Sequence, residues 1–128
     1  EKALQINSEF PMAWNNRGIA LDNLKRYEEA LDAYENALSF DSEYVDAWYG
    51  KGKVLNNMEN YGEALDAYNQ ALSLDPEYVY AWNGKANALF GLKKYEDAIK
   101  AYDQALKIDP DYQLAKDNRE LAVNKLKQ

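Results

Sequence analysis

The apolar positions of this chain recur at the spacing of amphipathic α-helices. One stripe, with intervals of three or four residues, consists of Ala30, Leu31, Tyr34, Ala37 and Leu38. A second stripe precedes it and consists of Ala13, Trp14, Gly18 and Leu21. Such intervals place side chains on one helix face, whereas a half-buried strand would alternate strictly. No stretch shows that alternation, so we expect an all-α protein built from paired helices.

The pair of stripes returns at an interval of 34 residues, as Trp14, Trp48 and Trp82 show. Further positions with the same interval are Tyr27, Tyr61 and Tyr95; Ala30, Ala64 and Ala98; Tyr34, Tyr68 and Tyr102; Ala37, Ala71 and Ala105; and Asp41, Asp75 and Asp109. A period of this length is typical of helical repeat arrays. We therefore divide the single array 1–128 into the end of a preceding repeat (1–10), repeats at 11–44, 45–78 and 79–112, and a capping helix at 113–128.

Short polar segments separate the predicted helices. LKRY, MENY and LKKY mark the turns inside the units, and Asp75-Pro76 and Asp109-Pro110 mark exits, because proline cannot continue a helix. Small residues recur at the predicted helix crossing, where Gly18, Gly52 and Ala86 should face Ala30, Ala64 and Ala98. Close approach of the helices requires such small side chains, so we expect Gly18→Leu to be poorly tolerated. The Trp and Tyr series are interpreted as core.

This order of Trp, Gly or Ala, Leu, Tyr, Ala, Tyr, Ala and Asp-Pro resembles the tetratricopeptide repeat over essentially the whole chain. The resemblance implies a right-handed superhelical solenoid of antiparallel helix pairs, with a concave groove lined by the first helix of each pair. Basic residues replace a frequent leucine of the family at Arg17, Lys51, Lys85 and Arg119. We interpret them as a subtype feature whose aliphatic stems pack between units.

The two ends of the chain differ. Ala3 and Leu4 correspond to Ala37 and Leu38, so we expect the sequence to begin inside a helix of a longer protein, with the packing partners of Ala3, Leu4 and Ile6 removed. In the last helix, Lys116 and Glu120 stand where Trp and Gly belong. A polar outer face of this kind suits a terminal unit, which needs it for solubility.

The resemblance also places a set of variable residues on the groove face. The candidate ligand-binding residues are Asn15, Asn16, Ile19, Asp22, Tyr49, Lys53, Asn56, Tyr80, Asn83, Asn87, Phe90, Asn118 and Asn124. Asparagine carries a donor and an acceptor and pairs with both groups of a peptide bond. One interpretation is an amide ladder for an extended peptide, with the aromatic residues supplying apolar contacts. The alternative is a solvated face that drift has kept neutral.

One specialised binding mode of the family is not expected. Members that bind chaperone tails clamp a terminal carboxylate with Lys, Arg and Asn at fixed places on three first helices. The matching positions here are Asn15, Ile19, Gly50, Tyr80 and Gly84. A shift by one unit gives Tyr49, Lys53, Gly84, Leu114 and Asn118. Neither set reproduces the clamp.

Composition narrows the classes of function. The net charge of −7 and the pI near 4.6 oppose sequence-independent binding to nucleic acid or to anionic membranes. The chain has no Cys and no His, which excludes disulfides and thiolate metal sites and removes the commonest general base. We find no nucleotide-binding glycine motif and no catalytic constellation. The acidic cluster Glu28, Glu29, Asp32 and Glu35 is interpreted as a solvated face rather than a cation site.

These observations predict a non-enzymatic protein–protein interaction module, without metal or cofactor, that binds a peptide segment in its concave groove. Two alternatives stay open. One is a structural module that self-associates through the ends of the array, giving a homo-oligomer, and the other is the regulatory arm of a larger enzyme. The expected partner is a protein or peptide rather than nucleic acid or a membrane, and the expected compartment is the cytoplasm.

Overall fold

A computed structural model describes residues 2–128, with side chains from Phe10 onward. This part of the chain holds seven helices: α1 (Lys2–Asn23), α2 (Tyr27–Phe40), α3 (Val45–Asn57), α4 (Tyr61–Leu74), α5 (Val79–Gly91), α6 (Tyr95–Ile108) and α7 (Gln113–Lys127). No strand occurs within residues 2–128. The prediction of an all-α solenoid is confirmed.

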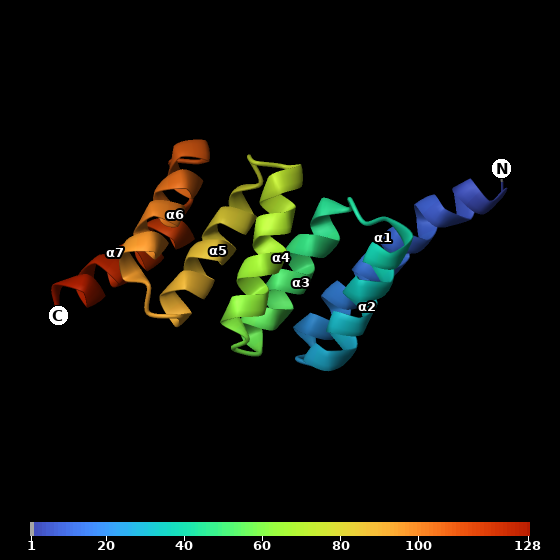
Figure 1. The fold of residues 1–128 in the computed structure, drawn as a ribbon, viewed down its shortest axis with the longest axis horizontal. Coiled ribbons are helices and arrows are strands. Elements are labelled where there is room, and N and C mark those ends of the chain that lie inside the picture. Colours follow the sequence, from blue (N-terminus) through green and yellow to red (C-terminus); the bar gives the residue numbers. More distant parts are fainter. Residues whose placement is uncertain (1) are drawn as a thin grey trace.

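The helices stand side by side along one axis, with the two chain termini at opposite ends (Figure 1). Each helix packs on the next one in sequence, and α3 also contacts both α1 and α5, while α5 contacts α7. Within residues 2–128 the backbones of the second helices α2, α4 and α6 stay more than 8 Å apart at every pair of Cα atoms. Because the first helices of successive units approach each other more closely than the second helices do, α1, α3, α5 and α7 form the inner face of the array.

Helix α1 is longer than the other helices. It runs from Lys2 to Asn23 and contains Pro11, at the point where the sequence analysis placed the boundary between a preceding repeat and the first full one. Proline removes one intrahelical hydrogen bond but does not always end a helix. The expected boundary is therefore not a break in the backbone. The predictions made for Ala3, Leu4 and Ile6 concern side chains outside the described residues.

The core consists of one buried tyrosine in each second helix, surrounded by alanines. Tyr34, Tyr68 and Tyr102 are among the largest fully buried side chains, and the core interpretation of this series is confirmed. The nearest neighbours of the glycines are tyrosine rings. A Cβ added to Gly18 or Gly52 would lie 2.8 Å from the nearest ring atoms of Tyr34 or Tyr68. The glycines therefore make room for a tyrosine ring, a partner that was not predicted from the sequence.

The same rings also reach the following unit. A Cβ on Gly50 would overlap the ring of Tyr34, and a Cβ on Gly84 would overlap that of Tyr68. Each of these two tyrosines thus packs against glycines of its own first helix and of the next one. In this way a single side chain joins successive units, and its close contacts fix how far apart they stand.

The turn inside each unit uses a left-handed backbone residue that is not glycine. Lys25, Glu59 and Lys93 have φ values of 63°, 64° and 65°. The amide of Lys94 donates to the carbonyl of Leu89 at 2.9 Å, and the amide of Lys93 donates to that of Phe90 at 2.9 Å. These bonds satisfy carbonyls at the end of the first helix, as in a Schellman motif. A side chain at such a position carries a conformational cost.

The tryptophans connect the first helices to the loops that precede them. The indole Nε1–H groups of Trp48 and Trp82 donate to the carbonyls of Ser42 and Pro76, each at 2.8 Å. Both indoles are half-buried and pack against the buried core, which agrees with the core interpretation of these tryptophans. Their outer faces are covered by the ammonium groups of Lys51 and Lys85, at 5.3 and 5.2 Å from the ring centroids.

The recurring basic residues also reach back to the previous unit. Lys51 Nζ lies 3.6 Å from Glu35 Oε2, and Arg119 Nε lies 2.6 Å from Asp103 Oδ1. Both acidic partners precede the basic residue by the same interval, on the second helix of the previous unit. These basic side chains therefore also form ion pairs between units, in addition to the packing of their aliphatic stems that was predicted. Such exposed pairs contribute little each, up to about 1 kcal/mol.

The first and last helices lack a neighbour on one side. Ala47, Ala81 and Ala115 are completely buried, whereas the equivalent Ala13 is exposed because no described helix covers it. At the other end, Lys116 and Glu120 are exposed on α7, as is expected for polar residues at these places.

Candidate functional site

The inner face contains two hollows that gather many of the predicted groove residues. The first, called the N-terminal hollow, has a volume of about 340 Å³. Its lining comes from α1, α2, α3 and the residue before α5, and consists of Asn15, Ile19, Asp22, Tyr34, Asp46, Tyr49, Gly50, Lys53 and Tyr78. Residues from two consecutive units thus meet in one concavity, as the period predicted.

The second, called the C-terminal hollow, has a volume of about 330 Å³. It is lined by Asn56, Tyr61, Asn87, Phe90, Tyr102, Asn118 and Leu121. Four of these residues are predicted groove residues, namely Asn56, Asn87, Phe90 and Asn118.

The remaining predicted residues lie outside both hollows. Asn16 and Asn124 are exposed. Asn83 is only 4% exposed, although the sequence analysis placed it on an accessible face. Tyr80 is exposed, and its ring lies near those of Tyr49 and Tyr112.

The floor of the N-terminal hollow carries a buried carboxylate. Asp22 is 7% exposed. Asn57 Nδ2–H donates to its Oδ1 at 3.0 Å, and Lys53 Nζ lies 3.6 Å from its Oδ2. A carboxylate with so little access to water needs such partners. Lys53 itself is half-exposed, so its ammonium group reaches both the carboxylate and solvent.

A second carboxylate lies at the wall of the same hollow. The hydroxyl of Tyr78 donates to Asp46 Oδ1 at 2.9 Å. Burial and this neighbouring carboxylate raise the pKa of Tyr78 above its ordinary value. The negative charge of Asp22 likewise adds to burial in raising the pKa of Tyr34. The hydroxyl groups that line the hollow are therefore held in their neutral form by burial and by negative charge.

A row of tyrosines runs along the inner face from the N-terminal hollow. Tyr49 stacks on Tyr78 at a centroid distance of 5.3 Å and lies 6.4 Å from Tyr80, which in turn lies 5.6 Å from Tyr112. Burial, and then Tyr112, Tyr80 and Asp22, raise the pKa of Tyr49 to about 12. The sequence analysis named Tyr49 and Tyr80 but missed Tyr78 and Tyr112. Their signal was present, because with Tyr44 they recur at the repeat interval directly before each first helix.

The asparagine amides fall into two groups. The Oδ1 atoms of Asn15, Asn56 and Asn83 are buried and have no hydrogen-bond partner among the described residues. In contrast, Asn87 Oδ1 accepts from the hydroxyl of Tyr102 and, at 3.3 Å, from Asn118 Nδ2. Asn87 therefore has a structural use. Asn15 and Asn56 line the two hollows, but their unpaired oxygens are themselves buried, and their amides lie beside the hydroxyls of Tyr44 and Tyr68.

Several apolar side chains are exposed on the same inner helices. They are Met12, Ile19, Tyr80, Leu114 and Leu121. All five belong to first helices or to α7. They give the inner face an apolar surface of the kind that marks interaction sites when it is contiguous.

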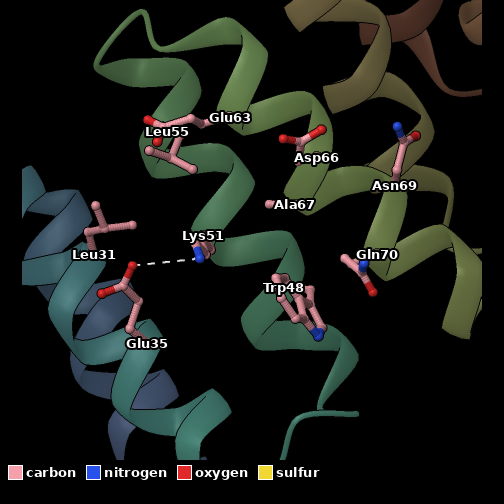
Figure 2. A pocket seen from close by; sticks show the side chains of 10 residues that line it. All are labelled: Leu31, Glu35, Trp48, Lys51, Leu55, Glu63, Asp66, Ala67, Asn69 and Gln70. Carbon is pink, nitrogen blue, oxygen red and sulfur yellow. Dashed lines mark ion pairs between the residues drawn. The ribbon is translucent and has the colours of Figure 1, made fainter.

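The outer face contains a larger hollow of about 500 Å³, called the outer crevice, between α2 and α4 over α3. Figure 2 shows Trp48 and Lys51 on its floor, the ion pair of Lys51 with Glu35, and the carboxylates of Glu63 and Asp66 on α4. A crevice of about 330 Å³ occurs at the equivalent place one unit later, where it includes Trp82 and Lys85. The second crevice is lined by α5 and α6 alone, whereas the first also includes Leu31 and Glu35 of the preceding second helix.

The described part of the chain contains neither a cluster of metal ligands nor a helix that could span a membrane. No group of three or more His, Cys, Asp or Glu side chains there is placed to hold a metal ion. None of the described helices combines the length and the apolar character needed to cross a bilayer.

The sequence matches known family models over most of its length. Residues 49–112 match a model described as tetratricopeptide repeat, and residues 11–44 match a second model with the same description. The chain belongs to the tetratricopeptide repeat family. The resemblance seen in the sequence is confirmed. No sequence among curated proteins matches this tetratricopeptide repeat protein.

Solved structures support the same fold. The first tetratricopeptide domain of Spaghetti (RPAP3), bound to the HSP90 peptide SRMEEVD, has a TM-score of 0.91 at 21% identity, over 94% of this chain and 96% of that one. The Arabidopsis OM64 domain has a TM-score of 0.87 at 19% identity, over 91% and 96% of the two chains. The second domain of human RPAP3, in complex with the HSP70 peptide SGPTIEEVD, has a TM-score of 0.86 at 20% identity, over 91% and 97%. At these identities the likeness concerns the fold.

Proposed function

We propose that this tetratricopeptide repeat chain is a non-enzymatic interaction module that binds an extended peptide segment along its inner face. The observation that carries the proposal is the combination of unpaired amide oxygens with exposed apolar side chains on that face. Asn15 and Asn56 each offer a buried acceptor without a donor, and Ile19 and Leu121 offer exposed apolar surface beside them.

A peptide offers groups that suit this surface. Its N–H and C=O groups pair with asparagine amides, and its side chains cover the exposed apolar atoms. Ordering a flexible peptide opposes binding, and the expected dissociation constant is on the order of micromolar.

The structurally similar proteins support a peptide as the class of ligand, since two of them are described with bound chaperone peptides. Both of those peptides end in EEVD and are acidic. The inner face of this chain presents Asp22 and Asp46 and lacks the clamp pattern. We therefore expect its preferred peptides to differ from acidic chaperone tails.

The test is a selection of binders from a random-peptide phage library, followed by affinity measurement with matched variants. Ile19→Ala and Leu121→Ala remove exposed apolar groups from the inner face. Ile108→Ala and Leu74→Ala make the same two replacements at exposed positions of the second helices. We expect the inner-face variants to weaken the selected peptides about tenfold each, and the control variants to leave affinity unchanged.

Helix content measured by circular dichroism should be the same in all four variants, because each residue is exposed. The proposal is wrong if the selection yields no binder. It is also wrong if inner-face and control variants bind the selected peptides equally.

A second candidate function, self-association, has one observation in its favour. Phe10 and Phe40 are both exposed at the first unit, and their rings meet edge to face at 5.1 Å. Exposed aromatic pairs are favourable contacts for a second copy. Light scattering over a wide concentration range decides between the two candidates: a strict monomer argues against self-association. No contact in the described residues argues specifically for a regulatory arm of an enzyme.

A further inference from the structure

The N-terminal hollow carries a negative charge. Two carboxylates, Asp22 and Asp46, line it together with a single ammonium group, that of Lys53. Lys53 pairs with Asp22 at 3.6 Å, whereas Asp46 receives only the neutral hydroxyl of Tyr78. The formal charge of the lining is therefore negative by one, and the charge without an ionic partner lies on Asp46.

Asn15 also lines the hollow. It is 5% exposed, and its Oδ1 is itself buried and has no donor among the described residues, while its amide lies beside the hydroxyl of Tyr44. The charge of Asp46 is therefore the feature of the hollow that favours a ligand group that donates hydrogen bonds.

The walls of the hollow suit the aliphatic part of a long side chain. The rings of Tyr49 and Tyr78, which stack at a centroid distance of 5.3 Å, line the hollow together with Ile19. Aromatic faces attract cations, and they also cover methylene groups. The volume is about 340 Å³ and the hollow opens to the inner face, so a side chain can enter from a peptide that runs along that face.

We propose that the N-terminal hollow binds a basic side chain, Arg or Lys, of the partner peptide. The proposal rests on the proposed function and specifies its ligand. The ammonium or guanidinium group donates to Asp46, and the aliphatic stem lies against the tyrosine rings and Ile19. Charge-assisted hydrogen bonds of this type are stronger than neutral ones.

The ammonium group of Lys53 competes with the ligand's cation for the negative charge of the N-terminal hollow. Its ammonium group is tied to Asp22 and is half-exposed, and the ligand's cation must enter beside it. Removal of that charge should therefore strengthen the binding of a basic peptide, whereas loss of the Asp46 charge should weaken it. A merely structural role of the two residues would not produce opposite effects on affinity.

The experiment uses the full chain and three synthetic decapeptide mixtures that are random except for a central Arg, Gln or Glu. Affinity is measured by fluorescence polarisation at low and at high salt. We expect the Arg mixture to bind about tenfold more tightly than the Gln mixture, the Glu mixture to bind most weakly, and the Arg preference to shrink at high salt. A fourth mixture with central Lys measures how much of the preference needs the planar guanidinium group.

Three variants complete the test. Asp46→Asn keeps an acceptor for Tyr78 and should reduce the Arg preference roughly fivefold, and Lys53→Met should increase it. Glu28→Gln makes the same change in net charge as Asp46→Asn at an exposed position of α2, and should leave the preference unchanged.

The outcomes separate the two proposals. If peptides bind and inner-face variants weaken them, but the Arg and Gln mixtures bind equally, the basic-side-chain proposal is wrong and the proposed function stands. Equal effects of Asp46→Asn and Glu28→Gln overturn it as well, since the preference would then come from net charge alone. If no mixture binds, both proposals are overturned.

Discussion

Replacement of Gly84 by alanine adds one methyl group against a ring that has little room to move. The new Cβ would lie 2.5 Å from Cε1 and 2.7 Å from the hydroxyl oxygen of Tyr68. Tyr68 is 2% exposed, and Ala64, Ala67 and Ala71 are buried on the same helix. The ring cannot retreat without disturbing this packing. Forced overpacking of a core costs about 1–3 kcal/mol.

The same replacement also gains helix propensity, about 1 kcal/mol for alanine over glycine, and a control must separate the two effects. Gly62 provides it, because a Cβ there meets no atom within 4 Å. Gly62→Ala should therefore stabilise the chain by up to about 1 kcal/mol. The difference in free energy of unfolding between the two variants reports the steric cost at Gly84. We expect Gly62→Ala to be the more stable variant by about 1–3 kcal/mol.

Urea unfolding followed by far-ultraviolet circular dichroism measures this difference through the transition midpoints. The reasoning is refuted if the midpoint of Gly84→Ala equals or exceeds that of Gly62→Ala. A second arm repeats the comparison in a Tyr68→Leu background, which removes the ring. There the cost of Gly84→Ala should shrink, because residues in direct contact do not behave additively.

Further predictions concern the turns, alkaline pH and the loop contacts. Lys93→Gly should stabilise the chain by about 0.5–1 kcal/mol in urea unfolding, because φ is 65° there, whereas Lys94→Gly, at a φ of −95°, should not. In the folded chain the pKa of Tyr49 is raised to about 12. The stability linked to this neutral hydroxyl is fully present below pH 10, where the tyrosine of the unfolded chain is also neutral, and it is lost as pH rises through 12. Stability should therefore fall less between pH 8 and pH 12 in Tyr49→Phe than in the parent, by on the order of 3 kcal/mol; an equal fall in both would contradict the assignment. Trp82→Phe removes the donor to the carbonyl of Pro76 and should cost about 1 kcal/mol beyond the loss of apolar area, as measured by the midpoint of urea unfolding.

The period of the sequence was sufficient for the arrangement of helices and for the identity of the buried tyrosines. The period could not assign the packing partner of each small residue, because a repeat interval identifies equivalent positions in successive units and does not say which atoms are in contact. Gly50 and Gly84 show the consequence: the sequence analysis considered them only as failed clamp positions, and the structure places both against tyrosine rings of the previous unit.

The inner face was predicted in outline but not in depth. A helical pattern taken one helix at a time counts Asn15 and Asn83 as accessible, whereas neighbouring first helices contact each other and bury them. The pattern likewise cannot tell an amide used inside the fold, such as Asn87, from one left without a partner. Tyr78 was missed because it precedes a helix and therefore belongs to no helical stripe.

The unequal spacing of the two helix layers has a mechanical consequence. The first helices of successive units contact each other, whereas a crevice separates α2 from α4. Each second helix also packs on the first helix of the following unit. A change in curvature must therefore alter both the width of the outer crevice and the packing between units, and the tyrosines held between glycines of two units resist it. A peptide that spans several units along the inner face meets a surface whose curvature is set by these buried rings.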